Sequence, residues 1–561
     1  MMSGKTLAEL LERRAGDDRP GLLFEDQVWS WREYVAECRA RGAWMDTLGR
    51  AAHVGALFDN VPEMLFLLGG AALSGHVLVA LNTTRSAAEL ARDADATHAD
   101  LIVHGPAYAE LAAEIAGLRA TAPPPARAGS ARAGPARDGG ARTGSAQDGP
   151  ARDGSLRTGS PGAVPVGEDG LVMLIFTSGT SGRPRAVRVT QRKIAVPGVS
   201  LAAMLSPEDV VYCSMPLFHS GAVMAAYAPA VASGAALVLR RRFSASGLMP
   251  DVRRYGVTYL HYVGKALSYV LSTPPEPGDR DGTLRIAFGN EGSATAVRRF
   301  GERFGCHVID AFGSTETAIA ITPDPAGPPG CLGRLPDGIE IRDPSSGRRC
   351  PAAVIEDGRL LNGDEAIGEL VNTEGPGLFD GYYDDPEADR ERIREGVFWS
   401  GDLAYADARG HVFFAGRGTE RLRVDGENLA VAPVEAVVRE FPGVIEAAVY
   451  PVPDAAAGDQ VMAALVLDGD FDQGAFAGFL AGRRDLGPKA IPRYIRICKE
   501  LPQTASNKVV KRVLAAEGWH TGDPVWWRPP GQPGWRPLTP DDITEIDDEF
   551  VRHGRRHPLE R

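Results

Sequence analysis

The chain has 561 residues, of which 44% are hydrophobic and 24% charged, a composition typical of soluble globular proteins and unlike that of disordered or coiled-coil chains. Its formal net charge of −12 argues against broad binding to nucleic-acid phosphates, because such binding needs a basic surface. At a usual domain length of about 150 residues the chain has room for three or four domain-sized units.

The N-terminal residues predict a charged amphipathic helix rather than a signal peptide, since no apolar core precedes a small-residue cleavage site. The best candidate for a membrane span, residues 66–81, carries Ser74 and His76 and is shorter than the roughly 20 apolar residues that a spanning helix needs. We therefore expect a buried helix followed by a strand. The six cysteines form no CxxC pair, which favours a reduced, cytoplasmic protein without a transmembrane segment.

Residues 123–162 are rich in Gly, Pro, Ala and Arg, and Leu156 is their only large apolar residue. Such a segment buries too little surface to offset its chain entropy, so we expect a disordered insert. Arg recurs at every fifth position over much of the segment. A weakly basic tether and a tolerated low-complexity loop are both compatible with this pattern.

From residue 171 onward the pattern is that of an α/β protein. The apolar run 171–176 has strand length, a Ser/Thr/Gly loop follows it, and residues 186–190 alternate with the period of a strand. Segments of helix length, such as 293–305, separate the later runs. This alternation predicts layered, mostly parallel sheets with crossover helices. The later apolar runs lie at 210–216, 235–240, 257–263, 284–289 and 307–313.

After about residue 416 the elements become those of a smaller α+β unit. A helix pattern at 432–442 precedes two strand patterns, a second helix, a further strand and a last helix. We expect a large N-terminal α/β domain at 1–416, a small C-terminal domain at 417–520 joined to it by a hinge, and an appended tail at 521–561.

The strongest chemical signal is a loop of Ser, Thr and Gly that directly follows the strand at 171–176. Bare backbone N–H groups and short hydroxyls of this kind can wrap a phosphate chain, and a basic side chain follows closely. The loop is not a Walker A motif, because it lacks the GK[ST] ending and a strand rather than a helix comes next. Taken alone, it also fits a flexible turn. Its residues are Thr177, Ser178, Gly179, Thr180, Ser181 and Gly182, followed by Arg185.

Further motifs follow this loop in a characteristic order, and together they resemble the series found in adenylate-forming enzymes, the superfamily of acyl-CoA synthetases, non-ribosomal adenylation domains and luciferases. The RxxGEN form and the GNEG loop are most similar to the fatty-acid transport protein and very-long-chain acyl-CoA synthetase branch, and the C-terminal motif resembles bacterial FadD-type enzymes. The motifs are Pro216–His219, Gly289–Gly292, Phe312–Glu316, Trp399–Asp402, Gly416–Arg417, Arg423 with Gly426–Asn428, and Asn507–Lys508.

The resemblance implies an acid–thiol ligase that uses ATP and Mg²⁺ to convert a carboxylic acid, of fatty or other lipophilic type, into an acyl-adenylate and pyrophosphate, and then transfers the acyl group to coenzyme A. Transfer to a carrier protein or to an amine is the alternative within the superfamily, and a non-catalytic binding protein is an alternative of another class. A homodimer and peripheral membrane contact also stay open.

The resemblance also implies a role for individual residues. The Ser/Thr/Gly loop holds the β- and γ-phosphates, Thr315 bonds the α-phosphate, and Glu316 ligates Mg²⁺. Asp402, helped by Arg417, binds the ribose, while Lys508 reaches the α-phosphate and the acid. His219 lies near the acyl site, although a core histidine fits it equally well; Glu316, Asp402 and Lys508 also have structural readings as a helix-start carboxylate, a turn former and a solvated lysine. The remaining nucleotide-binding candidates are Gly289, Asn290, Glu291, Asp310, Phe312, Gly313, Ser314 and Arg423.

Three positions depart from the pattern of the superfamily. Arg185 stands where Lys is usual, Phe312 replaces a Tyr and so removes a hydroxyl, and Thr419 takes the place of the hinge Asp. The first change keeps the charge but replaces a point charge with a planar guanidinium. These differences bear on the reaction rate and on the second half-reaction rather than on adenylation itself.

Overall fold

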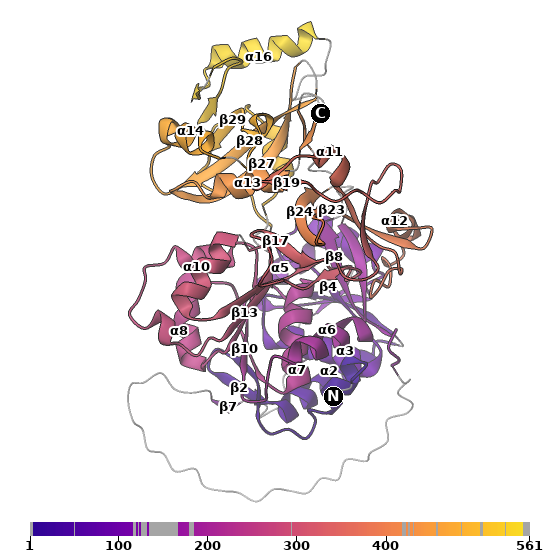
Figure 1. The fold of residues 1–561 in the computed structure, drawn as a ribbon. Coiled ribbons are helices and arrows are strands. Elements are labelled where there is room, and N and C mark those ends of the chain that lie inside the picture. Colours follow the sequence, from indigo (N-terminus) through magenta and orange to yellow (C-terminus); the bar gives the residue numbers. More distant parts are fainter. Residues whose placement is uncertain are drawn as a thin grey trace, which may run out of the picture. The chain divides into compact units, whose positions relative to one another are not determined.

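The computed structural model of the chain (Figure 1) describes residues 4–553 with internal gaps. Its contacts divide the chain into two units, which are described separately. Unit 1 comprises residues 1–261, 282–287 and 380–385, and unit 2 comprises 262–281, 288–379 and 386–561. Outside the description lie residues 1–3, 50, 116–118, 122, 125–131, 134–165, 179–183, 293, 418–421, 425–426, 430, 456–457, 484, 505–508, 533 and 554–561.

Unit 1 contains a six-stranded sheet whose strands are parallel except for the last pair. The strand order is β6 (Arg119–Thr121), β5 (Leu101–His104), β3 (His53–Leu57), β4 (Val77–Ala80), β8 (Leu171–Ser178) and β9 (Pro184–Thr190). β4 is wholly apolar and buried, and β3 and β5 are so except for one half-buried histidine each. Helices accompany these strands along the chain, as expected of a parallel sheet covered by helices. The helices of this region are α1 (Leu7–Glu12), α2 (Trp31–Asp46), α3 (Pro62–Ser74), α4 (Ala87–Ala96), η1 (Pro106–Tyr108) and α5 (Ala109–Glu114).

A second sheet of unit 1 is parallel in its centre and ends in two antiparallel strands. Its order is β12 (Tyr259–Val263), β10 (Val210–Cys213), β11 (Ala236–Leu239), β1 (Pro20–Phe24), β2 (Gln27–Ser30) and β7 (Arg132–Ala133). The helices are α6 (Gln191–Ala202), the π-helix η2 (Ala222–Tyr227), α7 (Ala228–Ser233) and α8 (Ala245–Tyr255).

Unit 2 begins in β12 and continues through α9 (Ala266–Leu271), η3 (Asp279–Asp281), the last residues of β13 (Ile286–Asn290), α10 (Ala294–Phe304) and β14 (His307–Asp310). An antiparallel sheet follows. Its order is β17 (Cys331–Arg334), β24 (His411–Arg417), β23 (Val397–Ala406), β21 (Gly368–Asn372) and β18 (Ile339–Arg342), with β22 (Ile393–Arg394) beside β23. Smaller elements are the β15–β16 hairpin (Phe312–Gly313, Ala320–Ile321), β19 (Ile355–Glu356), β20 (Arg359–Leu360), α11 (Gly363–Ala366), α12 (Pro386–Arg392), β25 (Leu422–Val424) and β26 (Glu427–Leu429).

The C-terminal part of unit 2 is built on a five-stranded sheet with an apolar core on each face. Alternate residues of its first strand supply the two cores, since successive side chains of a strand point to opposite faces: Val449 packs in one core and Tyr450 in the other. The strands are β27 (Val444–Pro453), β28 (Asp459–Leu467), β29 (Tyr494–Ile497), β30 (Val525–Trp527) and β31 (Arg536–Pro537), with helices α13 (Val431–Arg439), α14 (Gln473–Ala481), η5 (Pro488–Ala490), α15 (Lys511–Glu517) and α16 (Pro540–Arg552).

The α/β class predicted from the sequence is confirmed, and so is the helix followed by a strand at residues 66–81, which form α3 and β4. Among the described helices, none has the length and apolar character needed to cross a membrane. Of the expected disordered insert, all but residues 123–124 and 132–133 lie outside the described residues, and the last two form β7. The boundaries near 416 and 520 stay predictions.

Residues 521–553 contribute β30, β31 and α16 to the C-terminal sheet and its cores. The Trp535 indole N–H donates to the Pro492 carbonyl at 3.2 Å. Phe550 is 1% exposed and its ring lies 6.1 Å from that of Trp519. This segment is therefore packed into the fold.

We predict that Phe550→Ala lowers the free energy of unfolding by about 3 kcal/mol, because it opens a cavity in this core. Its neighbour Val551 is 73% exposed, so Val551→Ala is the matched control and should change stability by less than about 0.5 kcal/mol. Chemical denaturation followed by fluorescence measures both. Equal effects of the two changes would show that α16 is not docked.

Candidate active site

The proposed phosphate loop joins two paired strands of unit 1. Thr177 pairs with Arg185 and Ser178 with Pro184 in antiparallel register, so the strand expected after the loop is present. Residues 179–183 and the side chain of Ser178 lie outside the description. The Arg185 side chain is 10% exposed, and its guanidinium lies 5.5 Å from the centre of the Tyr382 ring. A fixed cation therefore stands beside the closing end of this loop.

Asn60 holds the turn that carries His219. Its Nδ2 donates to the carbonyl of Met215 at 2.7 Å, and its Oδ1 accepts from the N–H of Leu217 at 2.9 Å. These bonds take over backbone groups that would otherwise extend β10, which ends at Cys213 rather than at the expected residue 216. The half-buried His219 imidazole lies 4.9 Å from the Phe218 ring. The buried side-chain amide of Asn60, which lies just before α3, thus positions the turn that carries His219.

The Gly289–Gly292 loop belongs to unit 2 and lies against Tyr262. A methyl group on Gly289 would fall less than 3.0 Å from the Tyr262 carbonyl oxygen, so only glycine fits there without a shift. Glu291 has φ of +63°, a left-handed conformation that non-glycine residues rarely adopt. Asn290 is half-buried, and its Oδ1 atom has no hydrogen-bond partner among the described residues.

Asp310 closes this loop. Its Oδ2 atom accepts hydrogen bonds from the Tyr262 hydroxyl at 2.7 Å and from the Gly292 N–H at 2.6 Å. Burial raises the pKa of Asp310 to about 6, and the two hydrogen bonds oppose that shift. The carboxylate is therefore charged at neutral pH and fixes the glycine loop to the end of β14.

Thr315 and Glu316 lie in the loop of a short hairpin. Phe312 pairs with Ile321 and Gly313 with Ala320, so the loop residues are presented together at one end of the β15–β16 hairpin. Both side chains are half-buried. Within the same loop Thr317 has φ of +55°, and its N–H donates to the Ser314 carbonyl at 3.1 Å, which gives the turn one defined conformation.

Asp402 and Arg417 are brought together as the sequence predicts. They are paired across β23 and β24, with 3.4 Å between Asp402 Oδ1 and Arg417 Nε. Asp402 is 7% exposed, and its N–H donates to the Ser400 hydroxyl at 3.1 Å. Gly401 has φ of +79°, a left-handed conformation that favours glycine, directly before this buried carboxylate.

Lys508 and the side chain of Arg423 lie outside the described residues, so their predicted roles are untested. Sequence reasoning did not identify Asn60 as the residue that holds the His219 turn, or Tyr262 as the partner of Asp310. The sequence does contain a weak signal for Tyr262, because it lies in a buried strand and buried Tyr hydroxyls need hydrogen-bond partners.

We predict that Asp310→Asn becomes more stable than the parent protein as the pH rises from about 4 to 6, with no further change above. The Asp310 carboxyl has a folded pKa of about 6 and an unfolded pKa near ~3.9. The parent protein therefore loses folding stability over that window as the buried carboxyl ionises, whereas the variant, whose amide does not ionise, loses none. The difference at neutral pH should be on the order of 2 kcal/mol. Thermal unfolding at pH values from about 3.5 to 7.5 measures it, and a pH-independent difference would contradict this assignment.

We also predict that Gly289→Ala destabilises the protein by about 2 kcal/mol, because the added methyl group overpacks the Tyr262 carbonyl. Gly313→Ala is the control, since a methyl group there has its nearest neighbour, the Ile319 carbonyl oxygen, at 4.0 Å. Denaturant unfolding at neutral pH compares them. The close approach is disproved if the two variants unfold alike.

Comparisons with known proteins place the chain in a family. Residues 11–383 match the AMP-binding enzyme family, and residues 433–508 match the AMP-binding enzyme C-terminal domain. The chain is 43% identical to a steroid-22-oyl-CoA synthetase of Rhodococcus jostii over 99% of both chains. It is 45% identical to the medium/long-chain-fatty-acid–CoA ligase FadD17 of Mycobacterium tuberculosis over 93% of this chain and 98% of that one.

Solved structures agree on the fold. ATP-bound MatB from Rhodopseudomonas palustris matches with a TM-score of 0.74 at 23% identity, over 91% of this chain and 98% of that one. The AMP complex of the o-succinylbenzoate–CoA synthetase MenE from Bacillus subtilis matches with a TM-score of 0.70 at 22% identity, over 90% and 97%. The chain belongs to the AMP-binding enzyme family of adenylate-forming enzymes, as an acyl-CoA synthetase.

Proposed function

We propose that this protein activates a lipophilic carboxylic acid of the fatty or steroid side-chain type with ATP and transfers it to coenzyme A. The observation that carries the proposal is similarity over almost the whole chain to two kinds of CoA ligase, one named for fatty acids and one for a steroid acid. Both substrates pair one carboxylate with a large apolar body, and this shared chemistry defines the class.

In the first half-reaction an oxygen of the acid's carboxylate attacks the α-phosphorus of ATP. The bond from that phosphorus to the bridging oxygen breaks, and pyrophosphate leaves with its electron pair. The proposed phosphate loop of residues 177–182 holds the leaving phosphates through its backbone N–H groups, with Arg185 beside it. Thr315 and Lys508 would bond the α-phosphate, where negative charge develops and a positioned donor helps most.

The nucleoside would be bound by groups of unit 2. The Oδ1 atom of Asn290, which lacks a partner among the described residues, is an acceptor suited to an exocyclic amino group of the base. Asp402 offers a buried carboxylate to the ribose hydroxyls, and Arg417, 3.4 Å away, would help to orient it. Gly289 leaves room for the base to approach the backbone.

The residues present fit a magnesium ion bound together with ATP. No group of three or more His, Cys, Asp or Glu side chains that could hold a metal occurs among the described residues, and Mg²⁺ is commonly held by one or two carboxylates plus the substrate's phosphates. Glu316, on its hairpin loop, would supply that carboxylate. The ion, when bound, neutralises charge on the phosphate oxygens.

In the second half-reaction the thiolate of coenzyme A attacks the carbonyl carbon of the acyl-adenylate. The bond between that carbon and the phosphate oxygen breaks, and AMP leaves. His219, on its fixed turn, would lie next to the acyl group. An acyl-carrier protein as acceptor, a homodimer and a cytoplasmic location stay predictions.

The test is to incubate the protein with ATP, Mg²⁺, coenzyme A and a panel of medium-chain, long-chain and steroid side-chain acids. We expect AMP, pyrophosphate and the acyl-CoA in equal amounts with at least one acid. Lys508→Ala should lower adenylate formation about 100-fold or more, because it removes a charge from the transition state. Lys499→Ala, which removes an exposed lysine that follows β29, is the control. Release of ADP, or adenylate without thioester, would contradict the proposal.

A further inference from the structure

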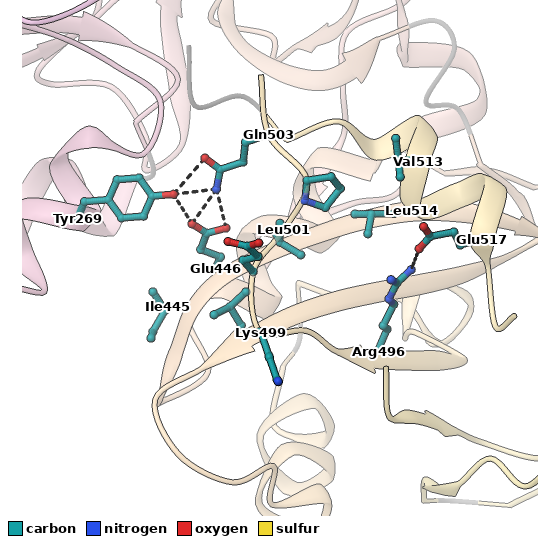
Figure 2. A pocket seen from close by; sticks show the side chains of 13 residues that line it. Tyr269, Ile445, Glu446, Arg496, Lys499, Leu501, Gln503, Val513, Leu514 and Glu517 are labelled. Carbon is teal, nitrogen blue, oxygen red and sulfur yellow. Dashed lines mark hydrogen bonds and ion pairs between the residues drawn. The ribbon is translucent and has the colours of Figure 1, made fainter. Parts of the chain in front are cut away.

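Four polar side chains of unit 2 form a cluster that none of the roles above uses. They are Lys265, Tyr269, Glu446 and Gln503, and we name them the Glu446 cluster. Lys265 caps the start of α9, Tyr269 lies within α9, Glu446 lies in β27 and Gln503 follows β29. Figure 2 shows the last three pointing toward one another from three different elements.

Hydrogen bonds join all four members. The Tyr269 hydroxyl donates to Glu446 Oε1 at 2.5 Å and accepts from Gln503 Nε2 at 2.8 Å. The same Gln503 amide lies 3.2 Å from Glu446 Oε1. The ammonium of Lys265 donates to the other oxygen of Glu446. A single carboxylate thus gathers three donors from segments far apart in the chain.

The two charged side chains of the cluster are shielded from solvent. The Glu446 side chain is 6% exposed and that of Lys265 13%. Burial lowers the pKa of Lys265, and Glu446 opposes that shift, while burial together with the Glu446 carboxylate raises the pKa of Tyr269 to about 12. Removing one member of a buried charged pair leaves the other uncompensated, which is costly. The cluster therefore holds one defined arrangement.

Gln503 also forms the base of the segment that carries Lys508. Its backbone pairs with Val509 in an antiparallel bridge, and the N–H of Val510 donates to the Pro502 carbonyl at 2.7 Å. The bridge thus brings together the residues on either side of segment 505–508. Whatever fixes Gln503 fixes both ends of this segment.

The other end of the cluster is tied to the Gly289–Gly292 loop. Lys265 directly follows Gly264, whose N–H donates to the Asn290 carbonyl at 2.8 Å. Two residues earlier, Tyr262 binds Asp310. A continuous series of contacts within unit 2 therefore runs from the proposed adenine-binding loop, through α9, to the base of the Lys508 segment.

A pocket of about 680 Å³ borders the cluster, and Tyr269, Glu446 and Gln503 line one side of it (Figure 2). On that side Gln503 faces open space rather than packed side chains. Polar contacts rather than close packing consequently hold Gln503 in place. Loss of the Tyr269 hydroxyl should therefore weaken the positioning of the Gln503–Val509 bridge.

We propose that the Glu446 cluster positions Lys508 for acyl-adenylate formation by fixing the Gln503–Val509 bridge relative to the Gly289–Gly292 loop. The inference rests on the proposed function. Its members are positioning residues, since they act through Lys508 and touch neither ATP nor the acid. Without them the base of the segment moves, and a displacement of about 1 Å can slow a reaction by up to about 100-fold.

The experiment measures the two half-reactions separately in Tyr269→Phe, Glu446→Ala and the control Glu500→Ala. Glu500 is an exposed carboxylate that lines the same pocket. Exchange of pyrophosphate into ATP should fall about 5-fold in Tyr269→Phe and about 10- to 100-fold in Glu446→Ala, and stay within about 2-fold in the control. Thioester formation from synthetic acyl-adenylate should stay within about 2-fold of the parent in all three.

A double-variant measurement separates positioning from a general structural effect. In the Lys508→Ala background, Tyr269→Phe should cause no further loss of pyrophosphate exchange, because the group it positions is absent. A full additional loss would overturn the inference. Tyr269→Phe deletes only a hydroxyl, so it keeps the test valid if Glu446→Ala does not fold.

The outcomes distinguish the inference from the function on which it rests. A parent protein inactive with every acid overturns the proposed function and this inference with it. An active parent, with Tyr269→Phe and Glu446→Ala indistinguishable from Glu500→Ala, overturns only the inference. Equal losses in both half-reactions also overturn it, since they indicate damage to the fold rather than misplacement of Lys508.

Discussion

The close approach of Gly289 to the Tyr262 carbonyl is the constraint from which the proposed nucleotide-binding part of unit 2 is built. Because Gly289 has no side chain, the proposed adenine-binding loop can lie closer to β12 than any other residue would allow. The same tyrosine then uses its hydroxyl to hold Asp310, which in turn holds the N–H of Gly292. One residue thereby determines the position of both sides of the loop.

The side chains of the candidate site are held in place with few formal charges. Carboxylates are buried only where backbone N–H groups, hydroxyls or a guanidinium meet them, as at Asp310 and Asp402, in agreement with the cost of burying an unpaired charge. Backbone strain is also placed here, at Glu291 and Thr317. Such strained residues persist where the surrounding structure imposes them and are typical of binding sites.

The sequence predicted those features that depend on neighbours along the chain. Apolar runs located β8 to β14 and β27 to β29, and the motif order identified the family. The resemblance also assigned Asp402 and Arg417 to one task, and these residues lie on adjacent antiparallel strands. Polar contacts between distant segments could not be predicted. Asn60 meets Leu217 and Lys265 meets Glu446 only because folding brings together residues more than 150 positions apart. The two C-terminal strands after residue 520 were missed because strands of three and two residues are too short to show a repeated alternation.

Activation of the acid as an acyl-adenylate can be followed by the transfer of oxygen-18 from labelled acid. Attack by the carboxylate on the α-phosphorus leaves one carboxylate oxygen on AMP once coenzyme A has displaced it. We expect AMP that carries one labelled oxygen, with unlabelled pyrophosphate. Label in inorganic phosphate together with ADP, or AMP without label, would contradict it.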